Sequence, residues 1–277
     1  MVKKLFKHEI AYYLRSMLPI YGILLAIAAM TRIIFFFEAD NTVYEIISTI
    51  AILSYAVAII AVFAMTMVFT ITRYYRHLFT SEGYLTFTLP VTPTQHIMTK
   101  LSTAVLFHVL SSLVILASLC VVTSGDVLIE IFKAAEYIFG EMPALFAREF
   151  KNTTAAQWQV NFWLFAIEFI VLIIATNIYQ MLLFYTCITI GQMFKKNRIL
   201  GAVGVYFGYY MITQAIGTVF VIVSSFLPWE SLGELFMGAP IACIHSVMLG
   251  SLLLNLLIAL ALFFICRFII RRKLNLE

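Results

Sequence analysis

Long apolar runs separated by short polar segments dominate the sequence. Six of these runs approach or exceed the roughly 18 residues that a helix needs to cross the core of a bilayer. The second and fourth runs are longer than a bilayer is thick, so we expect these helices to tilt or to extend into water. The pattern predicts an all-α membrane protein with one transmembrane domain over residues 1–277. The predicted spans are about 17–37, 46–72, 101–123, 161–190, 199–224 and 246–266.

The composition agrees with this pattern. Of the 277 residues, 63% are hydrophobic and 12% are charged, whereas a soluble domain has about 25% charged residues. So few charges cannot cover a surface in water, so membrane lipids must surround the chain. The cysteines lie in or beside apolar runs without the spacing of a metal site, and side-chain packing is their expected role. They are Cys120, Cys187, Cys243 and Cys266.

The distribution of Lys and Arg predicts the orientation. Six spans place both termini on one side of the membrane. If that side is cytoplasmic, fourteen of the 18 Lys and Arg residues fall in cytoplasmic segments, and four fall outside: Arg32, Lys133, Arg148 and Lys151. Short cytoplasmic loops are enriched in Lys and Arg. We therefore expect a multi-pass protein of the bacterial inner membrane with both termini in the cytoplasm.

The start of the chain has the pattern of an amphipathic helix. Over residues 1–16, apolar side chains gather near one helical face and most lysines lie elsewhere. This pattern is typical of a helix that lies in the membrane interface, here along the inner leaflet. Pro19 marks the point where we expect this helix to turn into the first span. The apolar face consists of Leu5, Phe6, Ile10, Tyr13 and Leu14.

Two longer segments connect the spans. Residues 124–160 form the longest outer loop, parts of which look helical, and residues 73–100 form the longest cytoplasmic loop. The core of the cytoplasmic loop reads SEGYLTFTLPVT over residues 81–92. It resembles a motif of bacterial ABC transporter permeases of the type-2 exporter class, in which a DEGYLTLTLP pattern follows the second span. In that class a lysine opens the third span, where this chain has Lys100, and Ser81 replaces the usual acidic residue.

The resemblance implies a permease subunit without a catalytic site, which exports an amphiphilic cargo such as a peptide, a lipid or a drug. The motif would form a coupling helix that docks into a separate ATP-binding subunit through exposed aromatic side chains and an acidic charge. ATP and Mg would bind to two copies of that subunit, because this sequence contains no GxxxxGK[ST] P-loop. The alternative is a loop at headgroup level with interfacial aromatic residues. The coupling residues would be Phe79, Glu82, Gly83, Tyr84 and Leu85.

The same resemblance implies a dimer, with a second copy of this chain or a sister permease. Gly204 and Gly208 form a GxxxG pair in the fifth predicted span, which allows helices to approach closely between two subunits or within one. In relatives of this class the second and fifth spans border the central cavity, so polar residues there are candidates for the translocation path. Interhelical hydrogen bonds or interfacial anchoring explain any single one of them more simply. The candidates are Tyr55, Thr66, Tyr206, Tyr210, Thr213 and Gln214.

Glu168 is the one acidic residue well inside a predicted span. A carboxylate at the centre of a bilayer costs at least about 2.5 kcal/mol, so it is a candidate functional residue that faces a partner or water. An ion-driven secondary transporter is the alternative function, because such proteins carry ionisable residues near the membrane midplane. An intramembrane enzyme finds no support, since neither HExxH nor GxSxG occurs. Scattered histidines and dispersed basic residues indicate neither a metal site nor a nucleic-acid interface.

Overall fold

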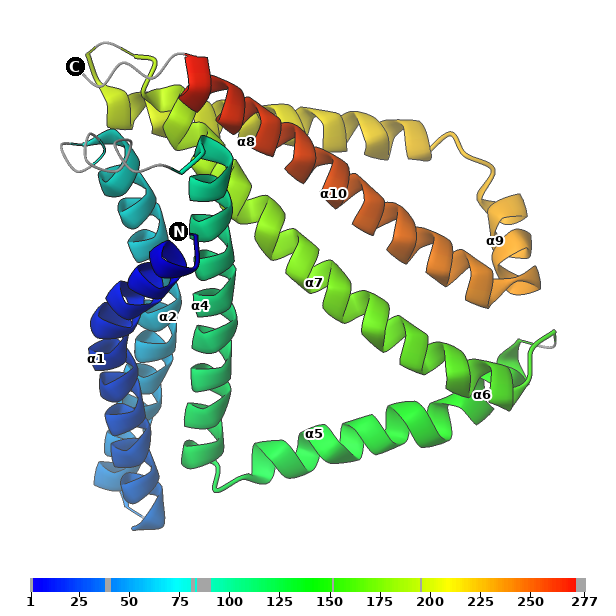
Figure 1. The fold of residues 1–277 in the computed structure, drawn as a ribbon. Helices are drawn as coiled ribbons and strands as arrows, with labels where there is room; N and C mark the ends of the chain where they lie inside the picture. The colour runs from blue at the N-terminus through cyan, green and yellow to red at the C-terminus, as the bar shows by residue number, and fades with distance from the viewer. Residues whose placement is uncertain are drawn as a thin grey trace. The chain divides into compact units, whose positions relative to one another are not determined.

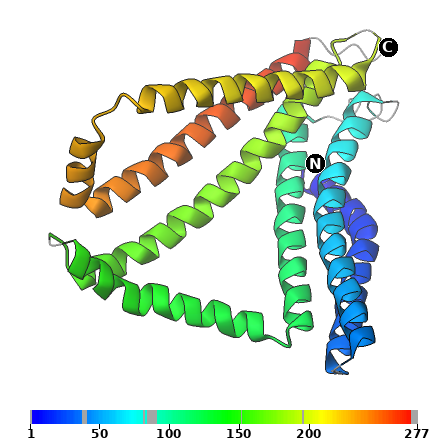
Figure 2. The same cartoon turned by 180° about the vertical axis from the view of Figure 1, so that it is seen from behind.

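The structure is a computed structural model that describes residues 2–37, 41–80, 83, 91–150, 152–194 and 196–272. Six of its helices are long and apolar enough to cross a membrane. The prediction of an all-α multi-pass membrane protein is confirmed at this level, and the described residues contain no strand. The six helices, labelled in Figure 1 and seen from behind in Figure 2, are α1 (Val2–Phe36), α2 (Thr42–Phe79), α4 (Pro93–Val122), α7 (Ala155–Gly191), α8 (Arg198–Ser224) and α10 (Pro240–Arg272).

Shorter helices occupy the connections that are predicted to lie outside. The predicted outer loop 124–160 contains α5 (Asp126–Glu136), the π-helical turn η1 (Tyr137–Glu141) and α6 (Met142–Glu149). The helix α9 (Trp229–Gly238) precedes α10. The chain divides into two compact units, which we call unit 1 and unit 2, with the boundary between Lys133 and Ala134. The single transmembrane domain stays a prediction, and each unit is described by itself.

In unit 1, α1 packs against both α2 and α4. The residues that α1 buries recur every three or four positions, so they form one stripe along the helix. The stripe contacts buried residues of the other two helices, among them Tyr55, Val62 and Phe107. This core extends over most of the length of α1. The stripe consists of Tyr13, Met17, Tyr21, Leu24 and Ala28.

Hydroxyl groups bridge the helices of unit 1. Tyr21 Oη lies 2.7 Å from Ser111 Oγ, which is 2.9 Å from Thr66 Oγ1, so one hydroxyl chain joins α1, α4 and α2. Nearer the start of α2 and the end of α4, Tyr55 Oη lies 2.8 Å from Ser118 Oγ. In lipid no hydrophobic effect drives helices together, so interhelical hydrogen bonds contribute to their association. Each such bond stabilises the packed helices by about 0.6 kcal/mol on average.

Helix α1 runs without a break from Val2 to Phe36 with Pro19 inside it, so the structure does not divide the predicted interfacial helix from the first span. Proline has a φ angle that suits a helix, and membrane helices tolerate the lost backbone hydrogen bond when neighbouring helices hold them. Tyr13 and Met17 before Pro19 and Tyr21 after it are buried in one continuous stripe. A separate interfacial helix over residues 1–16 is therefore not confirmed, and Leu14 of its predicted apolar face is 41% exposed.

Helix boundaries extend past the predicted spans because local sequence signals set them. Helix α4 begins at Pro93, eight residues before the predicted third span, where Thr92 and Gln95 form a reciprocal capping box. Helix α7 begins with a second box, formed by Thr154 and Gln157. Helix α2 continues to Phe79, so both ends of the predicted cytoplasmic loop are helical.

In unit 2, α7 contacts α6, α8 and α10. At its start, the buried Trp158 packs with Phe150 and Phe165, and partly buried residues of α6 and α10 cover them. Towards its end, Thr186 Oγ1 donates to the Leu262 carbonyl oxygen at 3.2 Å, and Thr189 Oγ1 lies 3.4 Å from Cys266 Sγ. Contacts at both ends of α7 therefore hold α10 against it.

Helix α8 differs from the other long helices, because within unit 2 it contacts only α7 and it buries none of its described residues. Phe184 of α7 stacks on Tyr206 at 5.4 Å between ring centroids, and the hydroxyl groups of Tyr179 and Tyr209 form a hydrogen bond. The turn before α8 requires Gly191, since a Cβ atom there would lie 2.7 Å from the Ala202 backbone nitrogen.

Replacing Gly191 with Ala should therefore destabilise the α7–α8 turn. Backbone atoms must shift to admit the new methyl group, and overpacking of this kind typically costs about 1–3 kcal/mol. Thermal unfolding of the purified protein in detergent should show a lower midpoint. The matched control is Gly217→Ala in α8, where nothing lies within 4 Å of the new Cβ atom and the better helix propensity of Ala should hold or raise the midpoint. An unchanged midpoint for Gly191→Ala would contradict the close approach.

Candidate functional site

A buried ion cluster joins the three helices of unit 1 near the predicted cytoplasmic loop. We call it the Glu9 cluster; it consists of Glu9, Arg73, His77 and Lys100. The Glu9 side chain is 2% exposed, and its Oε1 accepts a hydrogen bond from Lys100 Nζ at 3.0 Å. Its Oε2 accepts from Arg73 Nε at 3.2 Å. His77 Nδ1 lies 3.7 Å from Oε1, beyond hydrogen-bond distance.

The cluster satisfies the requirements of a buried charge. Removing a carboxylate from water costs several kcal/mol, and close cations with good hydrogen-bond geometry offset that cost. Glu9 has a cation on each oxygen, and the Arg73 guanidinium also stacks on the Tyr12 ring at 3.7 Å. One carboxylate of α1 thus connects the last part of α2 with the first part of α4.

The predicted coupling segment lies between these two helix ends. Glu82, Tyr84 and Leu85 lie outside the described residues. Gly83 is buried, its N–H donates to the Thr80 carbonyl oxygen at 2.7 Å, and a Cβ atom there would lie 2.6 Å from the Leu78 carbonyl oxygen. Any side chain at Gly83 would therefore displace backbone, which explains why the turn after α2 carries glycine.

The expected exposure of the coupling aromatics is wrong for Phe79, which packs beside the buried Tyr74. Phe79 is 8% exposed and Tyr74 is 1% exposed. Their rings contact each other at 5.8 Å, and Phe79 also contacts Tyr75 at 6.5 Å. These rings pack together at the end of α2. Phe79 would therefore contribute to coupling by holding the end of α2 in its conformation, not by contacting a partner directly.

The candidate path residues divide into two groups. Tyr55 and Thr66 are buried in unit 1, where both form interhelical hydrogen bonds. Tyr206, Tyr210, Thr213 and Gln214 lie on the exposed surface of α8, and the Thr213 hydroxyl donates to backbone carbonyls of its own helix. The path stays a prediction for all six.

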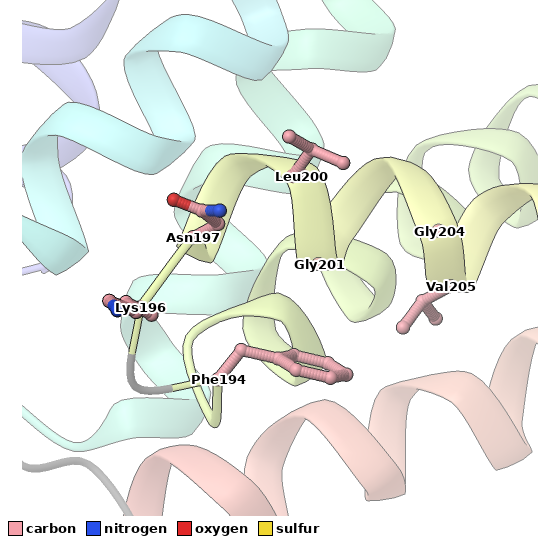
Figure 3. Close-up of a pocket in the computed structure, with 7 residues that line it drawn as sticks. All are labelled: Phe194, Lys196, Asn197, Leu200, Gly201, Gly204 and Val205. Atoms are coloured by element: carbon pink, nitrogen blue, oxygen red, sulfur yellow. The ribbon is translucent and has the colours of Figure 1, made fainter.

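The GxxxG pair lies on an open part of α8. No atom lies within 4 Å of a Cβ atom built on Gly204 or on Gly208. Within unit 2, no described residue packs closely against these glycines. The dimer contact and the packing within one subunit both stay predictions. A groove of about 670 Å³ passes Gly204 and runs back to the turn before α8 (Figure 3).

Glu168 has two polar partners in unit 2. His245 of α10 places Nδ1 2.7 Å from Glu168 Oε1 and Nε2 2.8 Å from Asn161 Oδ1. The His245 ring packs on Phe165 at 4.5 Å between ring centroids. The second carboxyl oxygen, Oε2, is buried without a hydrogen-bond partner among the described residues. We call Asn161, Glu168 and His245 the α7–α10 polar triad.

The hydrogen bonds of the triad limit its protons to two arrangements. Asn161 Nδ2 donates to the Gln157 carbonyl oxygen at 2.7 Å, so Oδ1 faces His245 and accepts from Nε2–H. The contact between Nδ1 and Glu168 then holds one proton, either on His245 as an ion pair or on Glu168 as a neutral pair. Both arrangements leave the two side chains with zero net charge, which makes them compatible with a membrane interior.

Sequence reasoning missed Glu9, Arg73, Asn161 and His245 as site residues. Glu9 has a local signal, since it lies four residues before Tyr13 and so begins the stripe that α1 buries. His245 lies only just before the predicted sixth span, and no local pattern pairs it with Glu168, 77 positions away. The described residues hold no group of three His, Cys, Asp or Glu arranged for a metal ion, and the four cysteines are free thiols.

Comparisons with known proteins found no match among protein-family models, curated proteins or solved structures.

The Glu9 cluster predicts a large loss of stability when one partner is removed. Glu9→Gln leaves Lys100 and Arg73 buried without their carboxylate, a change that costs about 3–5 kcal/mol. Unfolding midpoints in detergent should fall much less for Glu130→Gln, because Glu130 and its partner Lys133 are 72% and 65% exposed and such pairs contribute about 0–1 kcal/mol. The double variant Glu9→Gln with Lys100→Met should lose less stability than the two single variants lose together. Additive losses would show that the two residues are not coupled.

The triad predicts that Gln is a better replacement for Glu168 than Leu. The Gln amide nitrogen can donate to an unprotonated His245 Nδ1 and keep the bridge, whereas Leu leaves a buried imidazole nitrogen unpaired at about 1–3 kcal/mol. The unfolding midpoint should therefore fall more for Glu168→Leu than for Glu168→Gln. The control is Glu136→Leu on the exposed surface of α5, which should change it little. Equal midpoints for both Glu168 variants would contradict the hydrogen-bonded pair.

Proposed function

We propose that this chain is the permease subunit of an ATP-driven ABC exporter of the type-2 class in the bacterial inner membrane. It forms the translocation path for an amphiphilic cargo and performs no bond chemistry of its own. Two copies of a separate ATP-binding subunit supply the energy, with ATP and Mg bound there. A second copy of this chain or a sister permease completes the transporter, and both termini are cytoplasmic.

One observation carries the proposal. The SEGYLTFTLPVT segment, which resembles the coupling motif of that class, connects two helices whose ends are bonded to the same buried carboxylate. Arg73 lies six residues before the end of α2 at Phe79. Lys100 lies in the second turn of α4. A partner that moves the segment therefore acts on both helices at positions that Glu9 ties to α1.

The Glu9 cluster suits the transmission of movement. Separating one cation from the carboxylate would leave a buried charge unpaired, which costs several kcal/mol. When the segment is displaced, a joint movement of α1, α2 and α4 therefore costs less free energy than a movement that separates Arg73 or Lys100 from Glu9. This gives the ATP-driven movement a rigid element on which to act, and it gives Gly83 the role of a fixed turn at the end of α2.

One further feature supports a paired permease. Gly204 and Gly208 leave one side of α8 open to a close helix contact. The candidate path residues Tyr206, Tyr210, Thr213 and Gln214 lie on other sides of the helix, which has about 3.6 residues per turn, and Tyr206 stacks on Phe184 of α7. In the proposed transporter, a path along these four residues is therefore separate from the contact at the glycines.

Co-purification from bacterial membranes tests the proposal. The wild type should bring down a nucleotide-binding subunit with ATPase activity, whereas Glu82→Lys with Tyr84→Ala should weaken that association about tenfold or more, as expected for an aromatic anchor and a reversed charge. The matched control is Glu136→Lys with Tyr137→Ala on the predicted outer side, which should co-purify like the wild type. A wild type that brings down no ATPase under gentle conditions would overturn the proposal.

The α7–α10 polar triad favours ion-coupled secondary transport as a second candidate. It holds one proton between two titratable groups of neighbouring helices and leaves Glu168 Oε2 without a described partner. Ionisable groups in such positions are typical of ion-driven carriers. If no ATPase co-purifies, and proteoliposomes with the wild type dissipate a pH gradient faster than those with Glu168→Leu, the second candidate replaces the first.

A further inference from the structure

The groove beside the start of α8 has a basic entrance and apolar walls. It measures about 670 Å³, within the range of ligand-binding pockets. Figure 3 shows Lys196 and Asn197 at one end, before the first turn of α8, and Gly204 and Val205 further along the helix. Between these residues the helix advances by about 12 Å, since each residue adds about 1.5 Å. The remaining lining residues, Phe194, Leu200 and Gly201, are apolar.

Two glycines shape the groove. Phe194 lies against Gly201, where a Cβ atom would come within 2.6 Å of the ring carbon Cδ2, so only glycine allows the ring to form this wall. Gly204 has no atom within 4 Å of a Cβ position. The absence of a side chain at Gly204 therefore leaves the floor of the groove open, and Gly201 holds its wall in place.

The charges around the groove are positive. Lys196 lines the entrance, and Arg198 begins α8. The sequence contains no acidic residue between Glu168 and Glu230. Lys196 has no ion-pair partner among the described residues, and the Asn197 side chain does not cap α8. The positive end of the helix dipole adds to the attraction for an anion at this entrance.

We propose that this groove binds one anionic phospholipid of the inner leaflet, with its phosphate at Lys196 and one acyl chain along Gly201, Gly204 and Val205. The predicted orientation places the start of α8 at the cytoplasmic surface, where anionic headgroups lie. A slot with a cationic entrance and an apolar floor matches the two parts of such a lipid. The inference requires membrane insertion and this orientation, and it does not depend on transport or on an ATPase.

Native mass spectrometry of the purified full-length protein tests the site. The detergent-solubilised protein is titrated with dioleoyl phosphatidylglycerol or with dioleoyl phosphatidylcholine, which carry the same acyl chains. The wild type should bind the anionic lipid more tightly. Lys196→Gln should weaken phosphatidylglycerol binding about fivefold, as expected from about 1 kcal/mol per basic residue. It should weaken the binding of phosphatidylcholine, whose phosphate is balanced by its own choline, less than that of phosphatidylglycerol.

The glycines provide a matched pair of variants. Gly204→Leu fills the floor of the groove and should weaken the binding of both lipids, although it should fold, since nothing lies within 4 Å of the new Cβ atom. Gly208→Leu meets the same open space one turn further along, outside the lining residues, and should bind lipid like the wild type. Loss of dimers in both variants would concern the GxxxG contact and would be read separately from the lipid-bound masses.

A second basic groove provides a control for the attraction of anionic lipids to lysines in general. Lys3, Lys4 and Lys7 line an open groove of about 570 Å³ together with Phe6 and Ile10. The triple variant of these lysines to Gln should keep the phosphatidylglycerol preference. The inference is overturned if the triple variant abolishes the preference, if Lys196→Gln keeps wild-type affinity, or if Gly204→Leu binds phosphatidylglycerol as Gly208→Leu does.

Discussion

The buried Glu9 carboxylate constrains how α1, α2 and α4 pack. The stripe of Tyr13, Met17 and Tyr21 repeats at helical spacing, so apolar packing alone would tolerate a shift of α1 by one turn. Such a shift moves Glu9 by about 5.4 Å and breaks its bonds to both cations. Because an unpaired buried charge costs several kcal/mol, the ion cluster fixes a register that the apolar surface leaves open.

Polar contacts have the same role in unit 2. Lipid tails solvate apolar side chains as well as neighbouring helices do, so hydrophobic burial discriminates poorly between arrangements of membrane helices. Helix α10 meets α7 through His245 and Glu168 at one end and through Thr186 and Thr189 at the other. Two separated sets of directional bonds determine both the offset and the rotation of this helix pair.

The sequence predicts the spanning helices well, because an apolar run of bilayer length has few other structures available. It also contained the signal for the start of α4, since Thr92, Pro93 and Gln95 form a recognisable helix start. The pairing of Glu9 with Arg73 and Lys100 joins residues 64 and 91 positions apart. Periodicity is a local property and carries no information on such pairs.

Helix α8 is bound to its unit more weakly than the other long helices. It contacts α7 through the stacked Phe184 and Tyr206, the Tyr179–Tyr209 hydrogen bond and the close approach of Gly191 to Ala202. None of its own side chains is buried. Changing its tilt about the Gly191 end would require repacking two aromatic pairs and would expose no side chain that α8 itself buries. Within unit 2, α7 alone therefore sets the inclination of α8.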